Sequence, residues 1–193
     1  MSSYGALALA IHVLIAFVVP FHVTEATFFP CPCPAPPPPS GAPATFVVYL
    51  QDITAQNGTI PANATTVPVA GRQGIAYNLQ NFGTVFVTDD NITATASPNS
   101  ALLGQAQGTL IVTSLQSKYF QISLTLVFNA GPYANSTVVL LGVVNGLQAV
   151  RPVAVVGGTG VFTYAKGFAT FETVVLQGSY TVDKVTVTYK IRQ

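Results

Sequence analysis

Hydrophobic and polar residues alternate along much of the chain after residue 44, and this period of two is typical of strands with one buried face. In TFVVYLQDI, Phe46, Val48, Leu50 and Asp52 share a face, so an acid continues an apolar row. FGTVFVTDD places Thr84, Phe86, Thr88 and Asp90 on one side and Val85, Val87 and Asp89 on the other. No helical period is sustained, so we predict an all-β fold.

The alternating runs are separated by short turns, and together they predict about eight strands. Eight antiparallel strands of such apolar composition favour a closed barrel over a sandwich, because closure removes exposed edges. A barrel of this size leaves room for side chains or one small ligand, so we expect a central cavity. The strand-like runs are residues 45–53, 82–90, 101–114, 118–129, 137–144, 153–177, which supplies one or two strands, and 180–192.

The first 43 residues differ from the rest in composition. An apolar run from Gly5 to Pro20, followed by small residues, predicts a signal peptide over residues 1–26, with an uncleaved membrane anchor as the alternative. The proline-rich residues 27–43 predict an extended linker, and the folded domain is expected at 44–193. Cys31 and Cys33 in the linker are too close for an unstrained bridge, so we expect them to pair between chains or stay free.

Loss of the signal peptide would remove both histidines, His12 and His22, from the mature chain. Mechanisms that need an imidazole base or a histidine-bound metal are then excluded, and we expect no metal and no cofactor. Only 7% of the residues are charged and there is no basic patch, so no nucleic-acid partner is expected. We also expect no membrane association after cleavage.

Four Asn-x-Ser/Thr sequons occur in this secretory context and favour a glycosylated extracellular protein. We expect all four segments to be exposed loops or turns. The acceptor residues are Asn57, Asn63, Asn91 and Asn135.

The stretch VVGGTGVFTYAKG, residues 155–167, has the glycine density of a phosphate-binding loop. A dinucleotide fingerprint would need a third glycine where Thr163 stands, and a helix where the sequence is strand-like. No Gly-Lys-Ser/Thr follows, so a Walker loop is excluded as well. We therefore interpret the glycines as a turn that leads into a strand.

The same stretch resembles the C-terminal signature of the plant dirigent protein family, V-x-G-G-T-G-x-F-x-x-A-R-G-x-A. Four further segments resemble motifs of that family in the same order along residues 46–169. They are YLQDI, FGTVFVTDDNIT, LLGQAQGTLIVTS and LVFNAGPYANSTVVLLG.

The resemblance implies a secreted, often glycosylated, eight-stranded barrel of the plant apoplast or cell wall, commonly a homotrimer. Such proteins direct the regio- and stereochemistry of coupling between phenoxy radicals, such as those of monolignols in lignan biosynthesis. A separate laccase or peroxidase makes the radicals, so the expected partners are a phenolic small molecule and an external oxidase. Members can also promote cyclisation or dehydration of a phenolic intermediate, which would make this chain a conventional enzyme.

Carried over position by position, the resemblance implies two sets of site residues. Carboxylates at the mouth of an apolar cavity can accept a phenol hydrogen bond or transfer a proton. For Asp89 and Asp90 a turn-capping role before Asn91 is the structural alternative. The expected catalytic residues are Asp52, Tyr133 and Lys166, and the expected substrate-binding residues are Asp89, Asp90 and Phe128.

Three departures from the family pattern bear on activity. Lys166 stands where relatives have an arginine, Pro152 where lignan-forming members often carry an acid, and Gln51 where histidine is usual. Lysine keeps the charge but loses the planar fork of arginine. Two other classes therefore stay open: a non-catalytic wall or defence protein anchored by its linker and glycans, and an isomerase like allene oxide cyclase, which lacks the G-G-T-G signature.

Overall fold

The computed structural model describes residues 41–55, 59–116 and 118–191, all within one compact unit, Cys33–Gln193. The predicted signal peptide, nearly all of the linker with Cys31 and Cys33, and the sequon at Asn57 lie outside these ranges. Within them, no helix is long and apolar enough to cross a membrane.

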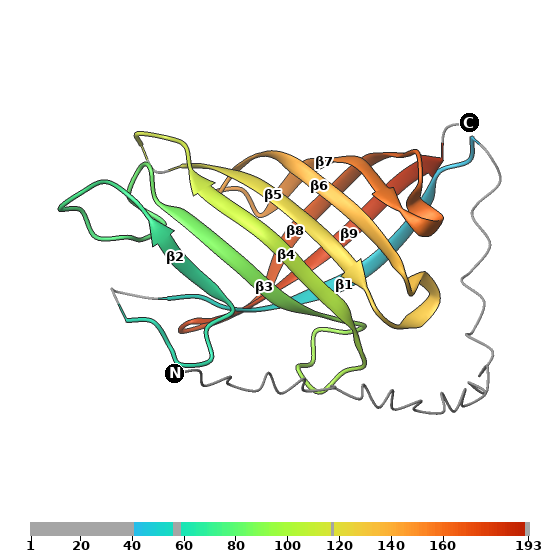
Figure 1. The fold of residues 1–193 in the computed structure, drawn as a ribbon, viewed down its shortest axis with the longest axis horizontal. Helices are drawn as coiled ribbons and strands as arrows, with labels where there is room; N and C mark the ends of the chain where they lie inside the picture. Colours follow the sequence, from blue (N-terminus) through green and yellow to red (C-terminus); the bar gives the residue numbers. More distant parts are fainter. Residues whose placement is uncertain (1–40, 56–58, 117, 192–193) are drawn as a thin grey trace, which may run out of the picture. The chain divides into compact units, whose positions relative to one another are not determined.

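The described residues form a single antiparallel sheet of nine strands and two short 3-10 turns (Figure 1). Each strand from β3 onward pairs with the next along the chain, as expected for runs joined by short turns. The elements are β1 (Ala44–Ile53), β2 (Thr66–Ala70), β3 (Val85–Thr93), β4 (Leu102–Val112), β5 (Tyr119–Phe128), η1 (Gly131–Tyr133), β6 (Ser136–Asn145), β7 (Val150–Thr159), η2 (Gly160–Phe162), β8 (Ala165–Gln177) and β9 (Tyr180–Ile191).

Eight of the strands close into a barrel because β1 pairs with both β9 and β3. The seam between β1 and β3 is short, with Tyr49 opposite Thr93, Leu50 opposite Ile92 and Gln51 opposite Asn91. The ninth strand, β2, lies outside this ring and extends the sheet beyond β3. The prediction of an eight-stranded antiparallel barrel is thus confirmed.

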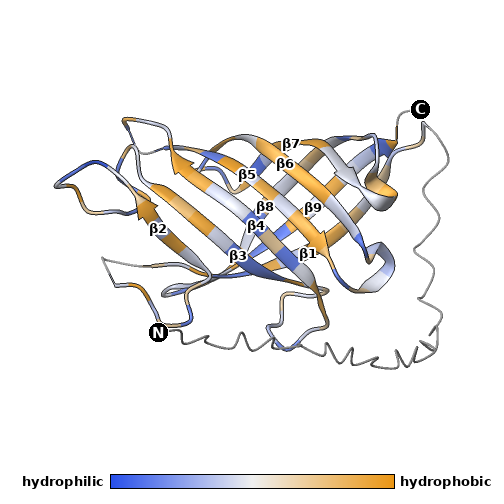
Figure 2. Ribbon diagram, viewed as in Figure 1, coloured by the Kyte–Doolittle hydropathy of each residue, from blue (hydrophilic) through white to orange (hydrophobic). Residues whose placement is uncertain are grey.

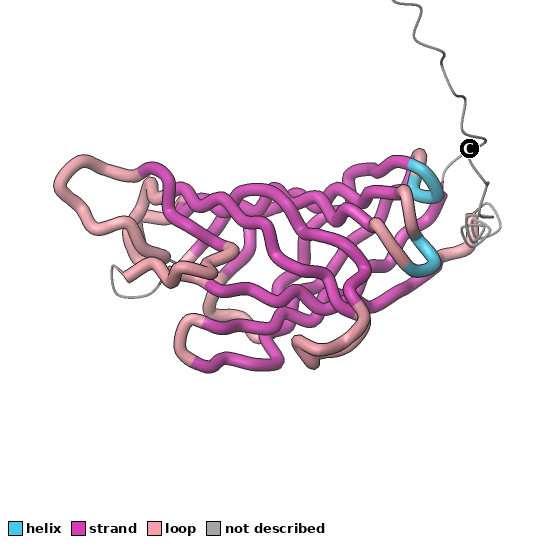
Figure 3. The backbone as a smooth tube through the Cα atoms, turned by 60° about the horizontal axis from the view of Figure 1, so that its bottom comes forward, coloured by secondary structure: helices cyan, strands magenta, loops and turns pink. Residues whose placement is uncertain are grey.

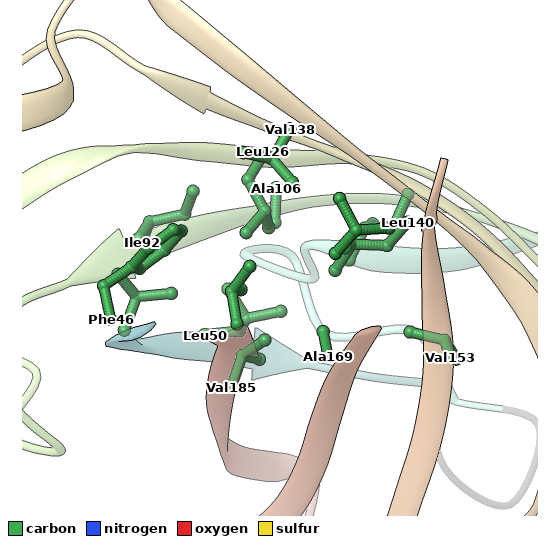
Figure 4. Packing of buried hydrophobic residues seen from close by; sticks show 14 of the residues in the cluster. Phe46, Leu50, Ile92, Ala106, Leu126, Val138, Leu140, Val153, Ala169 and Val185 are labelled. Atoms are coloured by element: carbon green, nitrogen blue, oxygen red, sulfur yellow. The ribbon is translucent and has the colours of Figure 1, made fainter. Parts of the chain in front are cut away.

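The barrel interior is filled by the apolar rows that the sequence alternation predicts. On β1, Phe46, Val48 and Leu50 are buried, whereas Thr45 and Val47, which point to the opposite face, are exposed. Figure 4 shows side chains from opposite sides of the barrel, such as Leu126 and Leu50, pointing toward one another. This packing closes the middle of the barrel and confines any cavity to one end.

Aromatic rings fill the end of the barrel where both 3-10 turns lie (Figure 3). Tyr133 of η1 and Phe162 of η2 have ring centroids 5.2 Å apart, and Phe46 lies 4.7 Å from Tyr133. We call this cluster the aromatic plug. Its members are Phe46, Phe128, Tyr133, Phe162 and Tyr189.

The glycine-rich stretch forms the turn predicted for it. Gly157 and Gly158 come directly before Thr159, the last residue of β7, and Gly160, with a φ of 61°, begins η2. A Cβ atom on Gly158 would overlap the carbonyl oxygen of Thr137 and lie 2.7 Å from the Cβ of Phe162. The second glycine therefore lets β6 and the plug approach β7 closely.

Two of the described sequons lie in turns and one does not. Asn63 and Asn135 are exposed in turns, as expected. Asn91 lies within β3, where it pairs with Gln51 of β1 and Gln105 of β4, so the prediction of a loop there is wrong. Its side chain is exposed because it points away from the barrel interior.

The outer surface of β6, β7 and β8 is apolar, as is their inner surface. Figure 2 shows that β6 is hydrophobic along much of its length. Leu141 pairs with Ala154, which pairs in turn with Phe168, so these side chains form one row across three strands. We call this row, with Val143 and Val156, the outer patch; its large members are all exposed.

Candidate functional site

A cavity of about 430 Å³ lies at the end of the barrel opposite the aromatic plug. The strand ends that line it carry Asp52 of β1, Leu110 of β4, Val144 of β6 and Thr181 of β9. This volume falls within the range of pockets that hold a drug-sized ligand.

The two sides of the cavity differ in polarity. Neighbouring strands β4, β5 and β6 supply an apolar wall. The strands β3, β1, β9, β8 and β7, which are also neighbours, supply a polar arc. The wall consists of Leu110, Phe120, Ile122, Leu124 and Val144, and the arc carries Asp90, Asp52, Asp183, Thr173 and Arg151.

Asp52 and Asp90 meet at the end of the seam between β1 and β3. The last paired residues of this ladder are Gln51 and Asn91, and the two acids come next on either strand. Thr54 donates its Oγ1 proton to Asp52 Oδ2 at 2.6 Å. The Oδ1 atoms of both acids are buried and have no hydrogen-bond partner within the described residues. Each acid therefore keeps one acceptor atom unused beside the cavity.

Burial changes the proton affinity of both acids. It raises the pKa of Asp90 to about 7, and the negative charge of Asp52 adds to this, while hydrogen bonds to Thr65 and Thr88 act in the opposite direction. Burial also raises the pKa of Asp52, offset by its hydrogen bond from Thr54 and reinforced by the charge of Asp183. Because each carboxylate disfavours ionisation of the other, the pair holds a proton near neutral pH.

A second polar group in the cavity joins three strands. Arg151 Nη2 donates to Asp183 Oδ1 and to Thr173 Oγ1, both at 2.9 Å. Thr173 Oγ1 in turn donates to the same Asp183 oxygen at 2.6 Å. The sequence analysis did not identify this group, although the alternation of inward and outward side chains along the strands would have indicated it. Arg151 continues the inward row of Val153 and Val155, and Asp183 continues that of Val185 and Val187.

Asp89 and Asp90, both of which were expected to bind substrate, lie on opposite faces of β3. Asp90 is buried and lines the cavity, whereas Asp89 is exposed on the outside. Asp89 Oδ1 there accepts a hydrogen bond from Gln107 Nε2 at 3.1 Å. A cavity role for Asp89 is thus not supported by its position, because neighbouring residues of a strand point to opposite faces.

Lys166 is exposed on the outer face of β8, so its position does not support the catalytic role expected for it. The inward row of β8 consists of Ala165, Ala169 and Phe171, and Lys166 has the opposite parity. It pairs across the ladder with Lys190, which is exposed as well.

Tyr133 and Phe128 both belong to the aromatic plug, and the described lining of the cavity includes neither. Burial raises the pKa of the Tyr133 hydroxyl. The structure therefore does not bring Asp52, Tyr133 and Lys166 into one site. It instead joins Asp52 to Asp90, Asp183 and Arg151.

Gln51, which replaces the histidine of the family pattern, lies on the outside of the seam. Its Nε2 donates to Thr93 Oγ1 at 2.7 Å, and its Oε1 accepts a hydrogen bond from the Tyr180 hydroxyl. These bonds tie β1 to β3 and β9, so this residue supports barrel closure. In the described ranges, no cluster of three or more histidine, cysteine or acidic residues is arranged to hold a metal ion.

The fold and cavity define a class of protein: a small antiparallel β-barrel with one amphipathic cavity and a buried acid pair on its polar side. The family model described as "Dirigent-like protein" matches residues 44–192. The chain belongs to the dirigent family.

Similar proteins come from the same family. Dirigent protein 23 of Arabidopsis thaliana is 36% identical over 107 residues, which cover 55% of this chain and 57% of that protein. Pterocarpan synthase 1 of Glycine max is 36% identical over 103 residues, covering 52% of this chain and 55% of that protein. The chain thus matches less than three fifths of the length of these curated relatives.

Solved structures agree with this assignment. The pterocarpan synthase dirigent protein PsPTS1 superposes with a TM-score of 0.69 at 27% identity, covering 80% of this chain and 99% of that one. GePTS1, another pterocarpan synthase dirigent protein, gives a TM-score of 0.68 at 26% identity, with coverage of 79% and 87%.

Proposed function

We propose that the cavity binds a phenolic intermediate and promotes its cyclisation or dehydration by proton transfer between the ligand and the pair Asp52 and Asp90. The observation that carries this proposal is the buried Oδ1 atom of each acid, which has no hydrogen-bond partner among the described residues. Two such atoms beside one cavity are costly unless they share a proton, as the raised pKa of Asp90 indicates, and exchange it with a ligand.

The pair can act as acid and base in one step. With one proton between them, the protonated carboxyl donates it to a leaving hydroxyl, which departs as water. The ionised carboxylate takes the proton of a phenol oxygen as that oxygen forms the new C–O bond. The pair ends with one proton, as it began. The pKa of Asp90, about 7, suits such exchange at neutral pH.

Three similar proteins support a synthase function. The similar protein of Glycine max and both solved structures carry the name pterocarpan synthase, so this family includes synthases. The cavity of this chain would bind its ligand with the aromatic faces against the apolar wall and the oxygen atoms against the polar arc.

The second candidate function is stereocontrol of coupling between monolignol-type phenoxy radicals that a separate laccase or peroxidase generates. The apolar wall supports it, because a flat wall opposite hydrogen-bonding groups can hold an aromatic radical with one face exposed. The acid pair would then bind the phenol oxygen or accept its proton.

Product analysis separates the two candidates. Purified protein is incubated with a panel of phenolic alcohols, without oxidant in one arm and with a one-electron oxidant in the other, and products are resolved by chiral chromatography. Cyclised or dehydrated product in the first arm supports proton transfer, and enantiomeric excess in the second supports radical stereocontrol.

Variants then connect either activity to the cavity. Asp52→Asn and Asp90→Asn are expected to lower product formation by about 10²- to 10⁴-fold, the usual contribution of a general acid or base. Asp89→Asn is the matched control, because this neighbour faces outward. Product formation that survives both cavity substitutions, or its absence over the whole panel, would favour the non-catalytic wall or defence role.

The resemblance also supports two proposals about the whole protein. We propose that it is secreted to the extracellular space and glycosylated, and the exposed side chains of Asn63, Asn91 and Asn135 are compatible with glycan attachment. We further propose a homotrimer in which the outer patch is buried, because large exposed apolar patches mark interaction surfaces.

A further inference from the structure

Gln51 is a buried polar residue on the outer face of β1, next in sequence to Asp52. It is only 7% exposed, and both polar atoms of its side chain are hydrogen-bonded. Nε2 donates to Thr93 Oγ1 of β3 at 2.7 Å and to the Ala96 carbonyl oxygen of the β3–β4 connection at 3.5 Å. Oε1 accepts a hydrogen bond from the Tyr180 hydroxyl of β9. The amide thus joins three strands, and we call Gln51, Thr93 and Tyr180 the outer bridge.

The outer bridge lies at the same point along the seam as the acid pair. In the backbone ladder Gln51 stands opposite Asn91, and Asp52 and Asp90 are the next residues on the two strands. Successive residues of a strand point to opposite faces, so the amide and the carboxyls occupy opposite sides of one short segment of sheet. The two acids line the cavity there, while the amide crosses the seam on the outside. A movement of β1 away from β3 therefore affects both sides together.

Side-chain hydrogen bonds supplement the short backbone ladder between β1 and β3. Thr93 Oγ1, which accepts the bond from Gln51, has two carbonyl acceptors for its own proton. These are Thr95 at 2.8 Å and Tyr49 at 3.3 Å. Thr93 is 2% exposed, so its bond to the amide is formed away from water. A buried polar group with all its bonds made fixes the geometry around it, because other arrangements leave a donor or acceptor unpaired. The outer bridge therefore restricts how far β1 and β3 can separate.

We propose that Gln51 is a positioning residue for the acid pair. By bridging β1, β3 and β9 on the outside of the barrel, it holds Asp52 and Asp90 at the separation at which they share one proton. Gln51 is not part of the cavity lining and contacts no ligand there. The other charged groups of the lining, Asp183 of β9 and Arg151 of β7, lie on strands that pair with β8 and do not depend on the bridge. This inference rests on the proposed function for the role of the acids, but it concerns their titration and not turnover.

Carboxyl carbon-13 NMR of aspartate-labelled protein tests the proposal without any substrate. In the native protein Asp90 should titrate with a pKa of about 7. Gln51→Met keeps the length of the side chain but removes its hydrogen bonds, so the charge of Asp52 should act on Asp90 from a greater distance. The titration midpoint of Asp90 should then fall by about one pH unit or more. Thr93→Val and Tyr180→Phe each remove one bond of the outer bridge and should lower the midpoint by less.

Thr45→Val is the matched control. Thr45 Oγ1 and Thr188 Oγ1 are hydrogen-bonded at 3.0 Å between β1 and β9, next to Phe46 of the aromatic plug and far from the acids. Losing this bond should leave the midpoint of Asp90 unchanged.

Proton–nitrogen spectra show which variants are folded, and the two single-bond variants carry the test if Gln51→Met is not. Native titration of Asp90 in a folded Gln51→Met protein would overturn the proposal. So would an equal fall in Thr45→Val, or a native Asp90 that titrates near its ordinary value. The NMR result does not depend on turnover, so an absence of product over the whole phenol panel would refute the proposed function and leave this inference standing.

Discussion

Asp52 and Asp90 occupy the first positions beyond the last paired residues, Gln51 and Asn91, of the ladder that closes the barrel. The inward parity of both strands turns the two acids into the same cavity. Burial raises both pKa values, and the charge of Asp52 adds to the shift of Asp90 while that of Asp183 adds to the shift of Asp52. A closure geometry that brings two strands together thus also creates an acid pair.

The raised pKa of Asp90 predicts how stability depends on pH. The folded state holds this proton up to about pH 7, whereas an unfolded aspartate releases it near pH 4, so the free energy of unfolding falls as the pH rises between these values. Asp90→Asn should flatten this dependence and stabilise the protein by roughly 2 to 4 kcal/mol at pH 8. Urea unfolding from pH 4 to 8 measures both effects, and equal slopes in the two proteins would contradict the assignment.

Lys166 should be dispensable for cavity chemistry. Its side chain is exposed on the outer face of β8, so Lys166→Ala should change the free energy of unfolding by less than about 0.5 kcal/mol and leave product formation and ligand binding intact. The measurement is a thermal melt together with the product assay. A loss of activity in a stable variant would mean that this lysine reaches a ligand after all.

The aromatic plug is expected to contribute stability. Phe128 is fully buried among Phe46, Tyr133 and Phe162, so Phe128→Ala should cost about 3 to 5 kcal/mol. Tyr133→Phe keeps the ring and should leave product formation unchanged, since the described cavity lining does not include this residue. Denaturant titration and the product assay distinguish these roles. Selective loss of product in Tyr133→Phe would instead restore the catalytic role implied by the family resemblance.

Adjacent glycines of β7 provide a matched pair for testing backbone approach. A Cβ at Gly158 would overlap the Thr137 carbonyl, whereas a Cβ at Gly157 has no atom within 4 Å. Gly158→Ala should therefore cost roughly 1 to 3 kcal/mol, and Gly157→Ala should lie within about 0.5 kcal/mol of the native protein. If both variants unfold at the same denaturant concentration, the close approach is not what requires the glycine.

The outer patch should decide the oligomeric state. Phe168→Glu places a charge in the middle of an exposed apolar row and should convert the proposed trimer to monomers. Sedimentation velocity measures the mass, and Tyr164→Glu is a control outside the row, at an aromatic residue that is 74% exposed against 52% for Phe168. A native protein that sediments as a monomer would contradict the trimer proposal.

Alternation along the strands made the barrel predictable, and it also located Asp52, which continues an apolar row. On β3 the apolar row of Val85 and Val87 continues into Asp89, which faces outward, so Asp90 was indicated by the family motif and not by the alternation. The same rule would have found Arg151 and Asp183, but the family motifs drew attention to Lys166 and Tyr133 instead. Parity along β8 assigns Lys166 to the outer face, and a motif pattern carries no information on which face a residue occupies. The ion pair of Arg151 and Asp183 depends on strand order, since β8 lies between their strands, and local sequence does not encode that order.

The unequal ladders of β1 have a consequence for solvent access. This strand pairs with β9 at ten positions but with β3 at only three, so the seam is the shortest ladder in the ring. The acid pair lies at its open end, where local fraying would admit water and lower both pKa values. A ligand that bridges β1 and β3 would hold the seam shut. It would thereby keep the acid pair, which donates a proton to it, in the protonated form. Amide exchange at Gln51 and Asn91, whose N–H groups face the seam, should accordingly slow when the cavity is occupied.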